Sequence, residues 1–257
     1  MQIFKLNEIT IHSFSIEELE KSLLDNLSSD QVPQIITTFN IDFLRIAEKN
    51  RDFLHICKNS LWNLPDGIGI TSLIRLKYKK KIERITGNEI FPILMKIANH
   101  YNYRVALIGS SQEVLDIVSA KIKKSFSEAI ENLLCISPQF LFEENKIINQ
   151  DIINKIIAFK PSIVFAALGC PRQEIWLSKN MQKFGSKINI GIGAVLDYHS
   201  GIKKRSPDLF QRFGFEWLWR LFNEPRRLFK RYIISDIPFY VKSVYRIYKS
   251  RFFKNSN

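Results

Sequence analysis

The chain has 257 residues, which is enough for one large α/β domain or for one domain with a smaller addition. A hydrophobic content of 46% is ordinary for a globular protein with a buried core. The net charge of +13 is uneven: residues 203–257 hold fourteen Lys or Arg and four Asp or Glu, and so carry ten of the thirteen net charges. The rest of the chain therefore has no excess of charge that would favour binding a polyanion.

Cysteine usage and hydropathy indicate the cellular compartment. Cys57, Cys135 and Cys170 are far apart and form neither a CxxC motif nor a Cys/His cluster, as in a reduced intracellular chain without disulfides or structural zinc. The first residues lack the basic and apolar segments of a signal peptide. No apolar run approaches the roughly 18 residues of a membrane-spanning helix. We therefore expect a cytoplasmic protein that is able to lie on a membrane surface.

Strand and helix patterns alternate over most of the chain. Ser15 and Glu18 form a capping box before a helical pattern that ends at residue 27. Further apolar strand patterns end in polar or small residues, and helical patterns follow most of them. These strand patterns lie within residues 33–40, 105–111, 161–174 and 188–201, and the clearest helical patterns within 41–60, 112–126 and 174–184. Such alternation predicts an α/β fold, with a Rossmann-like parallel sheet and flanking helices over residues 1–202.

The C-terminal part of the chain shows helical patterns only. Ser206 as N-cap and Pro207 at the first position predict one helix that ends near residue 223. Pro225 lies early in a second helical pattern, and a third begins at Ser235. We therefore predict a C-terminal helical appendage, basic and aromatic in composition, over residues 203–257.

Polar residues at strand ends are the site candidates, because ligands of such sheets bind outside the carboxyl ends of the strands. In chain order they are Thr37, Thr38 and Asn40; Asp66; Arg84 and Thr86; Gly109, Ser110 and Ser111; and Gly169, Arg172, Gln173 and Glu174. Each type also has an ordinary structural explanation. A Pro-Asp-Gly sequence favours a turn, small residues after a strand suit a helix N-cap as well as an anion, and a glutamate suits the first turn of a helix.

Several diagnostic motifs are absent from the sequence. It has no DxD element for a metal on a sugar-nucleotide diphosphate, and no P-loop, GxSxG or HExxH pattern. The GIGAV stretch at 191–195 lacks the spacing of a dinucleotide fingerprint. His12, His55, His100 and His199 have no triad or metal-ligand spacing, and we interpret them as structural. We therefore expect neither a metal nor an organic cofactor.

Seven stretches are informative in combination and order. They are TTFNIDFL, LPDGIGI, RITGNEIFP, VALIGSS, LGCPRQEIW, GIGAVLDYHSGIKKRSP and GFEWLWRLFNEPRRLFKRY. Over roughly residues 3–235 the chain resembles the WecG/TagA/CpsF family of bacterial glycosyltransferases. Two positions depart from the family pattern: Leu196 stands before Asp197 where Phe is common, and Cys170 stands where Ser or Thr is usual.

The resemblance implies a Rossmann-like enzyme that acts without a metal. It would transfer an N-acetylmannosamine-type sugar, or its uronic acid, from a UDP donor. The acceptor would be a lipid-linked sugar, typically N-acetylglucosamine on undecaprenyl diphosphate, and the products would be cell-surface polymers such as wall teichoic acid. The sequence does not distinguish among these donors and polymers, and it leaves the formation of a homo-oligomer open.

The resemblance also implies roles for residues of the body. Asp66 matches the family's proposed catalytic base, and an inverting transfer needs one carboxylate to take the proton from the acceptor hydroxyl. Thr38 and Asn40 would orient the donor sugar or the acceptor, and Gln173 would lie at the pocket. Arg84 would offset negative charge on the leaving diphosphate.

Three further residues, Gly109, Ser110 and Asp197, are our candidates for nucleotide binding. In the appendage, Arg220, Arg226, Arg227 and Arg231 would close over the active site.

The appendage interleaves tryptophans and arginines, as in Trp217 and Trp219 on either side of Leu218 and close to Arg220. Aromatic and basic residues together suit a membrane interface, where each basic residue contributes about 1 kcal/mol against anionic lipid. We therefore expect peripheral attachment to the inner face of the cytoplasmic membrane. Alternatively, the tryptophans pack on the body beneath a solvated basic face.

Two other classes of function are open at this stage. The basic aromatic tail suits single-stranded nucleic acid, but the polar residues at the strand ends would then have no purpose, so we expect no nucleic-acid partner. A binding module without catalysis is the other alternative.

Overall fold

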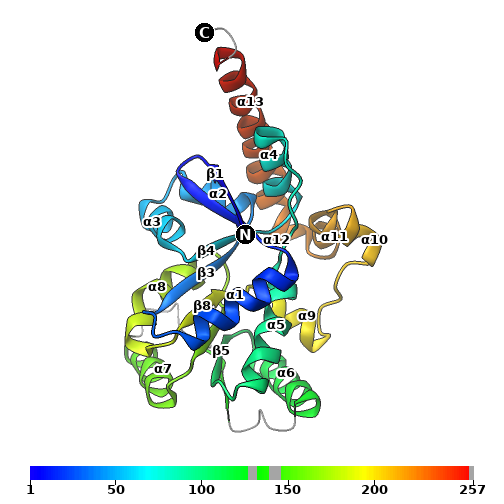
Figure 1. The fold of residues 1–257 in the computed structure, drawn as a ribbon. Helices are drawn as coiled ribbons and strands as arrows, with labels where there is room; N and C mark the ends of the chain where they lie inside the picture. Colours follow the sequence, from blue (N-terminus) through cyan, green and yellow to red (C-terminus); the bar gives the residue numbers. More distant parts are fainter. Residues whose placement is uncertain (127–131, 139–145, 255–257) are drawn as a thin grey trace.

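The computed structural model describes residues 1–126, 132–138 and 146–254. Its centre is a six-stranded, all-parallel sheet with the strand order β4-β3-β8-β7-β5-β6 (Figure 1). The strands are β3 (Gln34–Phe39), β4 (Trp62–Pro65), β5 (Val105–Gly109), β6 (Leu133–Ile136), β7 (Ile163–Ala167) and β8 (Ile188–Gly191). The Rossmann-like parallel sheet predicted from the alternating patterns is therefore confirmed.

Helices cover both faces of this sheet. One face packs on α1 (Ile16–Ser28), α5 (Gly87–His100), α6 (Gln112–Ser125) and α9 (Val195–Ser200). The other packs on α7 (Lys146–Phe159) and α8 (Arg172–Phe184), together with Ile56 of α3 (Arg51–Asn59). Within β5, Leu107 belongs to the first core and Ala106 and Ile108 to the second, as the alternation of strand side chains requires. Strands covered on both faces are therefore continuous apolar runs.

A hairpin at the N-terminus was not expected from the sequence. Strands β1 (Gln2–Leu6) and β2 (Ile9–Ser13) pair antiparallel and form a separate two-stranded sheet. The apolar side chains of the hairpin pack with α2 (Ile41–Ala47), α3, α4 (Ile68–Tyr78) and Phe239 of the appendage in a third core. This third core attaches the appendage to the body.

The capping box at Ser15 is confirmed, but several helix boundaries differ from the prediction. The pattern over 41–60 is divided between α2 and α3, because the Asn50 side chain accepts a hydrogen bond from the Phe53 amide and starts a new helix. The pattern after Ser206 is divided as well, into α10 (Asp208–Arg212) and α11 (Glu216–Asn223). Ser206 itself is buried, and Pro207 holds the N-cap position.

Gly214 separates α10 from α11. Its φ of +75° is in the left-handed region, and an added Cβ would lie 2.8 Å from the Ile68 Cβ. Only glycine therefore fits this turn without strain. Beyond it, Ser235 does not begin a helix as predicted, because α12 (Pro225–Phe229), η1 (Lys230–Asp236) and α13 (Ile237–Lys254) are continuous.

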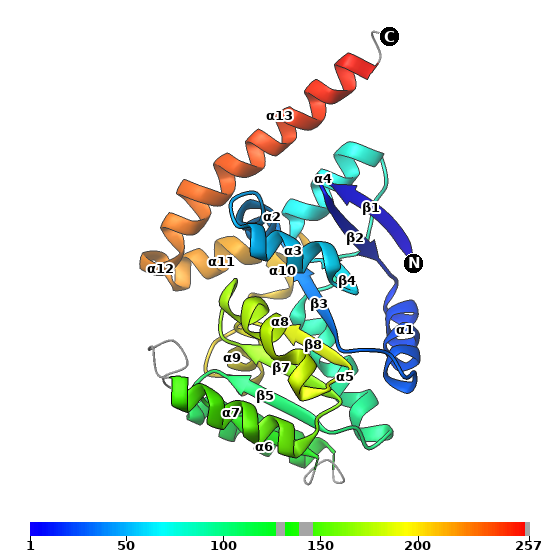
Figure 2. The same ribbon diagram turned by 90° about the vertical axis from the view of Figure 1, so that its left-hand side faces the viewer.

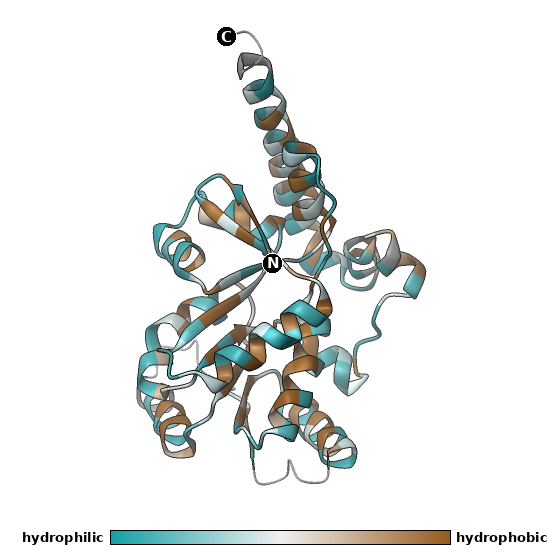
Figure 3. Ribbon diagram, viewed as in Figure 1, coloured by the Kyte–Doolittle hydropathy of each residue, from teal (hydrophilic) through white to brown (hydrophobic). Residues whose placement is uncertain are grey.

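The last helix, α13, extends from the body beside α4 (Figures 1 and 2). Hydrophobic and hydrophilic residues are interspersed along the coloured part of this helix (Figure 3). In the part of the chain that the structure describes, no helix combines the length and apolarity required to cross a bilayer.

Candidate active site

A cavity of about 460 Å³ lies where the carboxyl ends of β3, β4 and β8 face the appendage. The body lines it with Thr38 and Asn40 from the end of β3, Asp66 after β4 and Arg84 before α5. The appendage closes it with a set of side chains that includes Arg205, Glu216, Trp217, Arg220, Arg231 and Tyr232. Seven of the predicted site residues therefore meet in one cavity, and they are Thr38, Asn40, Asp66, Arg84, Thr86, Arg220 and Arg231.

Asp66 projects into this cavity from the turn after β4. Its amide donates to the Phe39 carbonyl at 2.9 Å, and Gly67, with φ of +84°, starts α4 directly after it. Burial raises the pKa of the Asp66 carboxyl to about 7, with a further contribution from Glu216 that Arg84 partly offsets. A carboxylate with a pKa near neutrality is well suited to remove a proton from a hydroxyl group.

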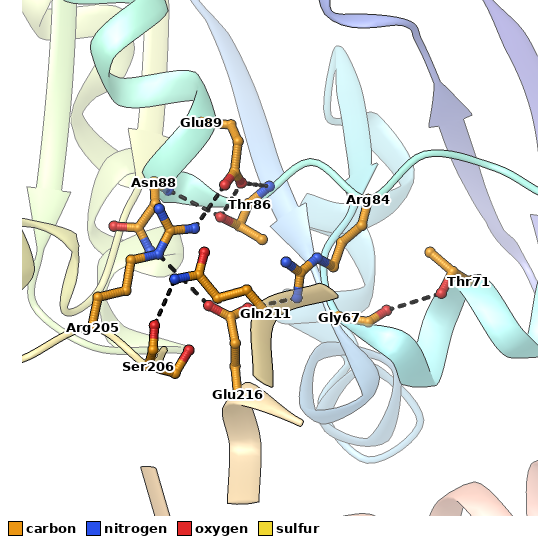
Figure 4. A network of polar contacts seen from close by, with 10 residues as sticks. All are labelled: Gly67, Thr71, Arg84, Thr86, Asn88, Glu89, Arg205, Ser206, Gln211 and Glu216. Carbon is orange, nitrogen blue, oxygen red and sulfur yellow. Dashed lines mark hydrogen bonds and ion pairs between the residues drawn. The ribbon is translucent and has the colours of Figure 1, made fainter. Parts of the chain in front are cut away.

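Arg84 is paired with a carboxylate of the appendage (Figure 4). Its Nη1 donates to the Glu216 Oε2 at 2.6 Å, and Glu216 Oε1 lies 3.7 Å from the Nε of Arg205. Arg205 in turn donates to Glu89 Oε1 at 2.8 Å. Positive and negative side chains thus alternate along one side of the cavity, and they come from the body, from the segment between α9 and α10, and from α11.

Glu89 is held in place by the first turn of α5. It forms a capping box with Thr86, whose amide donates to Glu89 Oε2 at 2.8 Å. Burial alone would raise the pKa of Glu89, but the hydrogen bonds from Thr86 and Arg205 outweigh it and lower the pKa. Glu89 is therefore ionised, and its charge adds to that of Glu216 in opposing ionisation of Asp66.

Arg220 is the cavity arginine that has no carboxylate partner within the described residues. Its Nε is buried without a hydrogen-bond acceptor. Burial alone would lower the pKa of Arg220, but Tyr232, Tyr198 and the more remote Asp66 and Glu224 carboxyls outweigh it, so the guanidinium stays charged. A half-buried cation without a carboxylate partner is costly unless a ligand neutralises it, so Arg220 is the group best placed to receive an anion.

Arg231 also lines the cavity, but two aspartates already bind it. Its Nη2 lies 2.9 Å from the Asp42 Oδ2, and its Nε lies 3.7 Å from the Asp236 Oδ2. Arg45 contacts the same two aspartates, so two arginines and two carboxylates balance. Burial, with the nearby Asp42, raises the pKa of Asp236 to about 6. The network joins η1 to α2, which gives Arg231 a structural role at this wall.

Arg226 and Arg227 lie outside the cavity. Both are exposed, and Arg227 Nε pairs with Glu224 Oε2 at 2.5 Å. In this structure they do not close over the site as expected.

Gln173 lies behind the cavity wall, not in it. Its Oε1 accepts from the amides of Gly169 and Gly193 at 3.1 Å each, and its Nε2 donates to Glu174 Oε1 at 2.6 Å. The side chain thereby joins the loops after β7 and β8. Burial raises the pKa of Glu174 to about 7. Gly191 lies so close to this side chain that an added Cβ would come within 2.3 Å of the Glu174 Oε1. The predicted pocket contact is therefore replaced by support of the loop that carries Ile192.

The predicted nucleotide residues form a separate cluster at the end of β5. Ser110 Oγ donates to Asp197 Oδ1 at 2.7 Å, and Lys203 Nζ lies 3.3 Å from Asp197 Oδ2. Gly109, with φ of +111°, would place a Cβ 2.6 Å from the Ala167 carbonyl oxygen. None of the three lines the cavity, although Tyr198, the residue after Asp197, does.

The tryptophans of the appendage are half-buried. Trp217 lines the cavity with its ring 6.2 Å from that of Tyr232, and the Trp219 ring lies 5.7 Å from that of Phe210. Both ring contacts are with aromatic residues of the appendage itself, so they do not test whether the tryptophans pack on the body.

Sequence reasoning missed Glu216, Arg205 and Tyr198. Glu216 lies within a stretch that carries the family resemblance, but a lone acid in a basic tail gives no sign of its partner 132 residues away. Within the described ranges, no three His, Cys, Asp or Glu side chains gather as a metal-binding group.

Comparisons with known proteins identify the family of the chain. The model of the glycosyl transferase WecG/TagA/CpsF family matches residues 4–255. An N-acetylglucosaminyldiphosphoundecaprenol N-acetyl-beta-D-mannosaminyltransferase of Bacillus subtilis (strain 168) is 30% identical over 237 residues, 92% of this chain and 87% of the relative. Enzymes of the same name from Bacillus spizizenii and Staphylococcus aureus (strain MRSA252) are 31% and 24% identical, over 89% and 90% of this chain and 84% and 85% of theirs. The chain therefore belongs to the WecG/TagA/CpsF family and is a glycosyltransferase.

Proposed function

We propose that this enzyme transfers an N-acetylmannosamine-type sugar, or its uronic acid, from a UDP donor to N-acetylglucosamine on undecaprenyl diphosphate. The observation that carries this is the Asp66 carboxyl in a cavity that also holds the unpaired Arg220 cation. The names of the relatives, which specify an N-acetylmannosaminyl group and an N-acetylglucosaminyl diphosphoundecaprenol acceptor, support it.

In the proposed reaction Asp66 takes the proton of the acceptor hydroxyl. The hydroxyl oxygen forms a bond to the anomeric carbon of the donor sugar, and the bond from that carbon to the diphosphate oxygen of UDP breaks. A single displacement inverts the anomeric centre and needs no protein nucleophile. The pKa of about 7 lets Asp66 be ionised near neutral pH and still accept a proton efficiently.

Cavity side chains would stabilise the leaving group and orient the sugars. The charged Arg220 guanidinium would neutralise the diphosphate oxygens as negative charge develops on them. Asn40 accepts from the Phe43 amide through its Oδ1, which leaves its amide NH₂ to donate to a sugar hydroxyl. Thr38 would provide a second contact at the same strand end. The absence of a DxD element from the sequence supports a transfer without a divalent metal.

The nucleotide would lie beside the cavity at the Ser110–Asp197 pair. A glycine turn at a strand end allows close approach of a ligand to the backbone, and a carboxylate is a suitable acceptor for ribose hydroxyls. The contact of Asp197 with Lys203 would then have to adjust.

The surface of the appendage supports attachment to an anionic membrane. Among the described side chains of the appendage, ten large apolar ones are exposed: Leu209, Phe213, Phe215, Phe222, Phe229, Ile234, Ile237, Val241, Tyr245 and Tyr248. Exposed basic residues lie between them, among them Arg226, Arg227 and Lys230. Exposed apolar side chains among basic ones suit the headgroup region of a bilayer.

Release of UDP tests the function. Purified enzyme is given a panel of UDP-sugars and a short-chain lipid diphosphate-N-acetylglucosamine, with a chelator and then with added Mg²⁺ or Mn²⁺. We expect UDP release with the N-acetylmannosamine-type donor in chelator. A strict requirement for a metal would contradict the proposal that Arg220 neutralises the leaving diphosphate without one. If none of the UDP-sugars gave UDP release, the proposed activity would be wrong.

A further inference from the structure

The mouth of the cavity is apolar. Of the described residues that line the cavity, the two that are exposed are both isoleucines, Ile68 (44% exposed) and Ile237 (40% exposed). The charged residues of the lining, such as Asp66 and Arg220, are buried or half-buried. A sugar nucleotide has no hydrocarbon chain to bury, so it does not account for exposed isoleucines at the lining of its cavity.

The two isoleucines lie where α4 meets α13. Ile68 begins α4 and packs on the Gly214 turn, and Ile237 begins α13. Behind them, the Ser72 and Tyr240 hydroxyls are 2.8 Å apart and connect the two helices. The rim is therefore formed by fixed elements.

An apolar stripe continues from this rim along α13. Val241, Tyr245 and Tyr248 follow Ile237 at helical spacing, and they are 59%, 65% and 49% exposed. A different face of α13, with Phe239, Val244 and Ile247, packs against the body. The exposed stripe is thus a second apolar face with no partner in the described chain, and it spans about 16 Å at 1.5 Å per residue.

We propose that the passage between Ile68 and Ile237, continued by this stripe, binds the first isoprenoid units of the acceptor lipid. The inference rests on the proposed function, which gives the acceptor a sugar diphosphate head and an apolar tail. The head would lie inside near Asp66, and the tail would leave past the two exposed isoleucines of the lining. Residues on α4 and α13 would therefore make the enzyme bind a diphosphate with a prenyl chain more tightly than a diphosphate without one.

Binding of small diphosphates tests this without catalysis. Farnesyl diphosphate and methyl diphosphate are titrated by calorimetry with no vesicles or detergent present, so membrane attachment cannot produce a difference. Because each fully buried methylene contributes roughly fourfold in affinity, we expect the farnesyl compound to bind at least about tenfold more tightly.

Substitutions then locate the tail. Ile68→Thr and Ile237→Gln should each reduce the ratio of the two affinities severalfold, and Tyr245→Gln, further along the stripe, should reduce it less. Ile157→Gln is the matched control, because Ile157 is a helical isoleucine of similar exposure, 38%, on the distant α7. It should leave the ratio unchanged.

The outcomes separate this inference from the proposed function. A ratio near one in the unaltered enzyme, or equal loss of both affinities in the Ile68 and Ile237 variants, would overturn the isoprenoid site. UDP release with an acceptor in which N-acetylglucosamine diphosphate carries a methyl group in place of the lipid would then still support the transferase activity. Preference for farnesyl diphosphate that depends on Ile237, without UDP release from any donor, would support the site and count against the activity.

Discussion

Strand β5 and helix α11 are both rich in apolar residues, yet their side chains have different surroundings. All five residues of β5 are buried, whereas none of the eight residues of α11 is. The apolar residues of β5 stabilise the fold, because they remove carbon surface from water on both faces of the sheet. In α11, by contrast, Trp217 lines the cavity and Phe222 faces solvent, so these two side chains contribute to a ligand site and to the surface and not to the core.

Charge pairs hold the two regions together as well. Arg84 with Glu216, Arg231 with Asp42 and Arg246 with Glu48 each join the body to the appendage. Partly exposed pairs of this kind contribute little individually, about 0–1 kcal/mol. The proposed base Asp66 is on the body, and the charges that influence its pKa come from both regions: Arg84 and Glu89 from the body, and Glu216 and Arg220 from the appendage.

The largest expected effect is on the body side. Asp66→Asn keeps the shape of the side chain but cannot accept the proton, so turnover should fall by about 10²–10⁴-fold. The measurement is UDP release at saturating substrates, with Asp208→Asn at the start of α10 as the control. Retention of more than about half the rate would mean that Asp66 is only a turn residue.

On the appendage side, Arg220→Met removes the unpaired cation and should slow transfer by about 10²–10³-fold, as loss of one preorganised donor does. Arg51→Met, an exposed arginine on α3, is the control. Comparable rates for both variants would exclude Arg220 from stabilisation of the leaving diphosphate.

Membrane attachment concerns the appendage alone. We expect the triple change of Arg226, Arg227 and Lys230 to Glu to weaken binding to anionic vesicles by about 10²-fold or more, at about 1 kcal/mol per basic residue. Arg231 is left unchanged because it is paired with Asp42. Co-sedimentation with anionic and neutral vesicles measures it. The rate of transfer to a lipid acceptor should fall more than the rate of transfer to a water-soluble acceptor. Unaltered vesicle binding would contradict a role of these residues in membrane attachment.

A pH profile tests the coupling between the two regions. Glu216→Gln removes a negative charge that raises the pKa of Asp66. It also removes the carboxylate partner of Arg84, and both changes favour the ionised form of Asp66. The acid limb of kcat/KM, expected near pH 7 in the unaltered enzyme, should therefore move to lower pH by an amount of the order of one unit. An unchanged or raised limb would show that Glu216 has no influence on the base.

The smallest effect is on stability. Since the pKa of Asp66 rises from 3.8 to about 7 on folding, the native state holds the extra proton between these values, and stability is lost as pH rises through this window. Asp66→Asn should therefore raise Tm relative to the unaltered enzyme at pH 8, and less so at pH 5. Thermal melts at both values measure this, and an equal difference at both would argue against the raised pKa.

Elements with a strong local pattern were predictable. Strands β5 and β7 are continuous apolar runs because both of their faces are covered, and the strand patterns of β3 and β8 are apolar apart from Gln34, Thr37, Thr38 and Asn189. Their ends converge at one edge of a parallel sheet, so Thr38, Asn40 and Asp66 were expected to be neighbours and are. Strand β6 was not predicted, because its four residues are only half-buried. The β1–β2 hairpin was missed as well, and it packs in a separate core.

The sequence by itself determined the parallel sheet, the polar strand ends and the basic, aromatic character of the tail, because each depends on residues close together in the chain. Only the tertiary structure decided which charges are paired. Arg84 and Arg231 meet carboxylates from distant segments, Arg220 meets none, and Gln173 turns away from the cavity to join two loops. Ion pairs form between the side chains that the packing of the appendage brings close together. The spacing of residues in the sequence does not specify the distance between two such side chains in the folded protein.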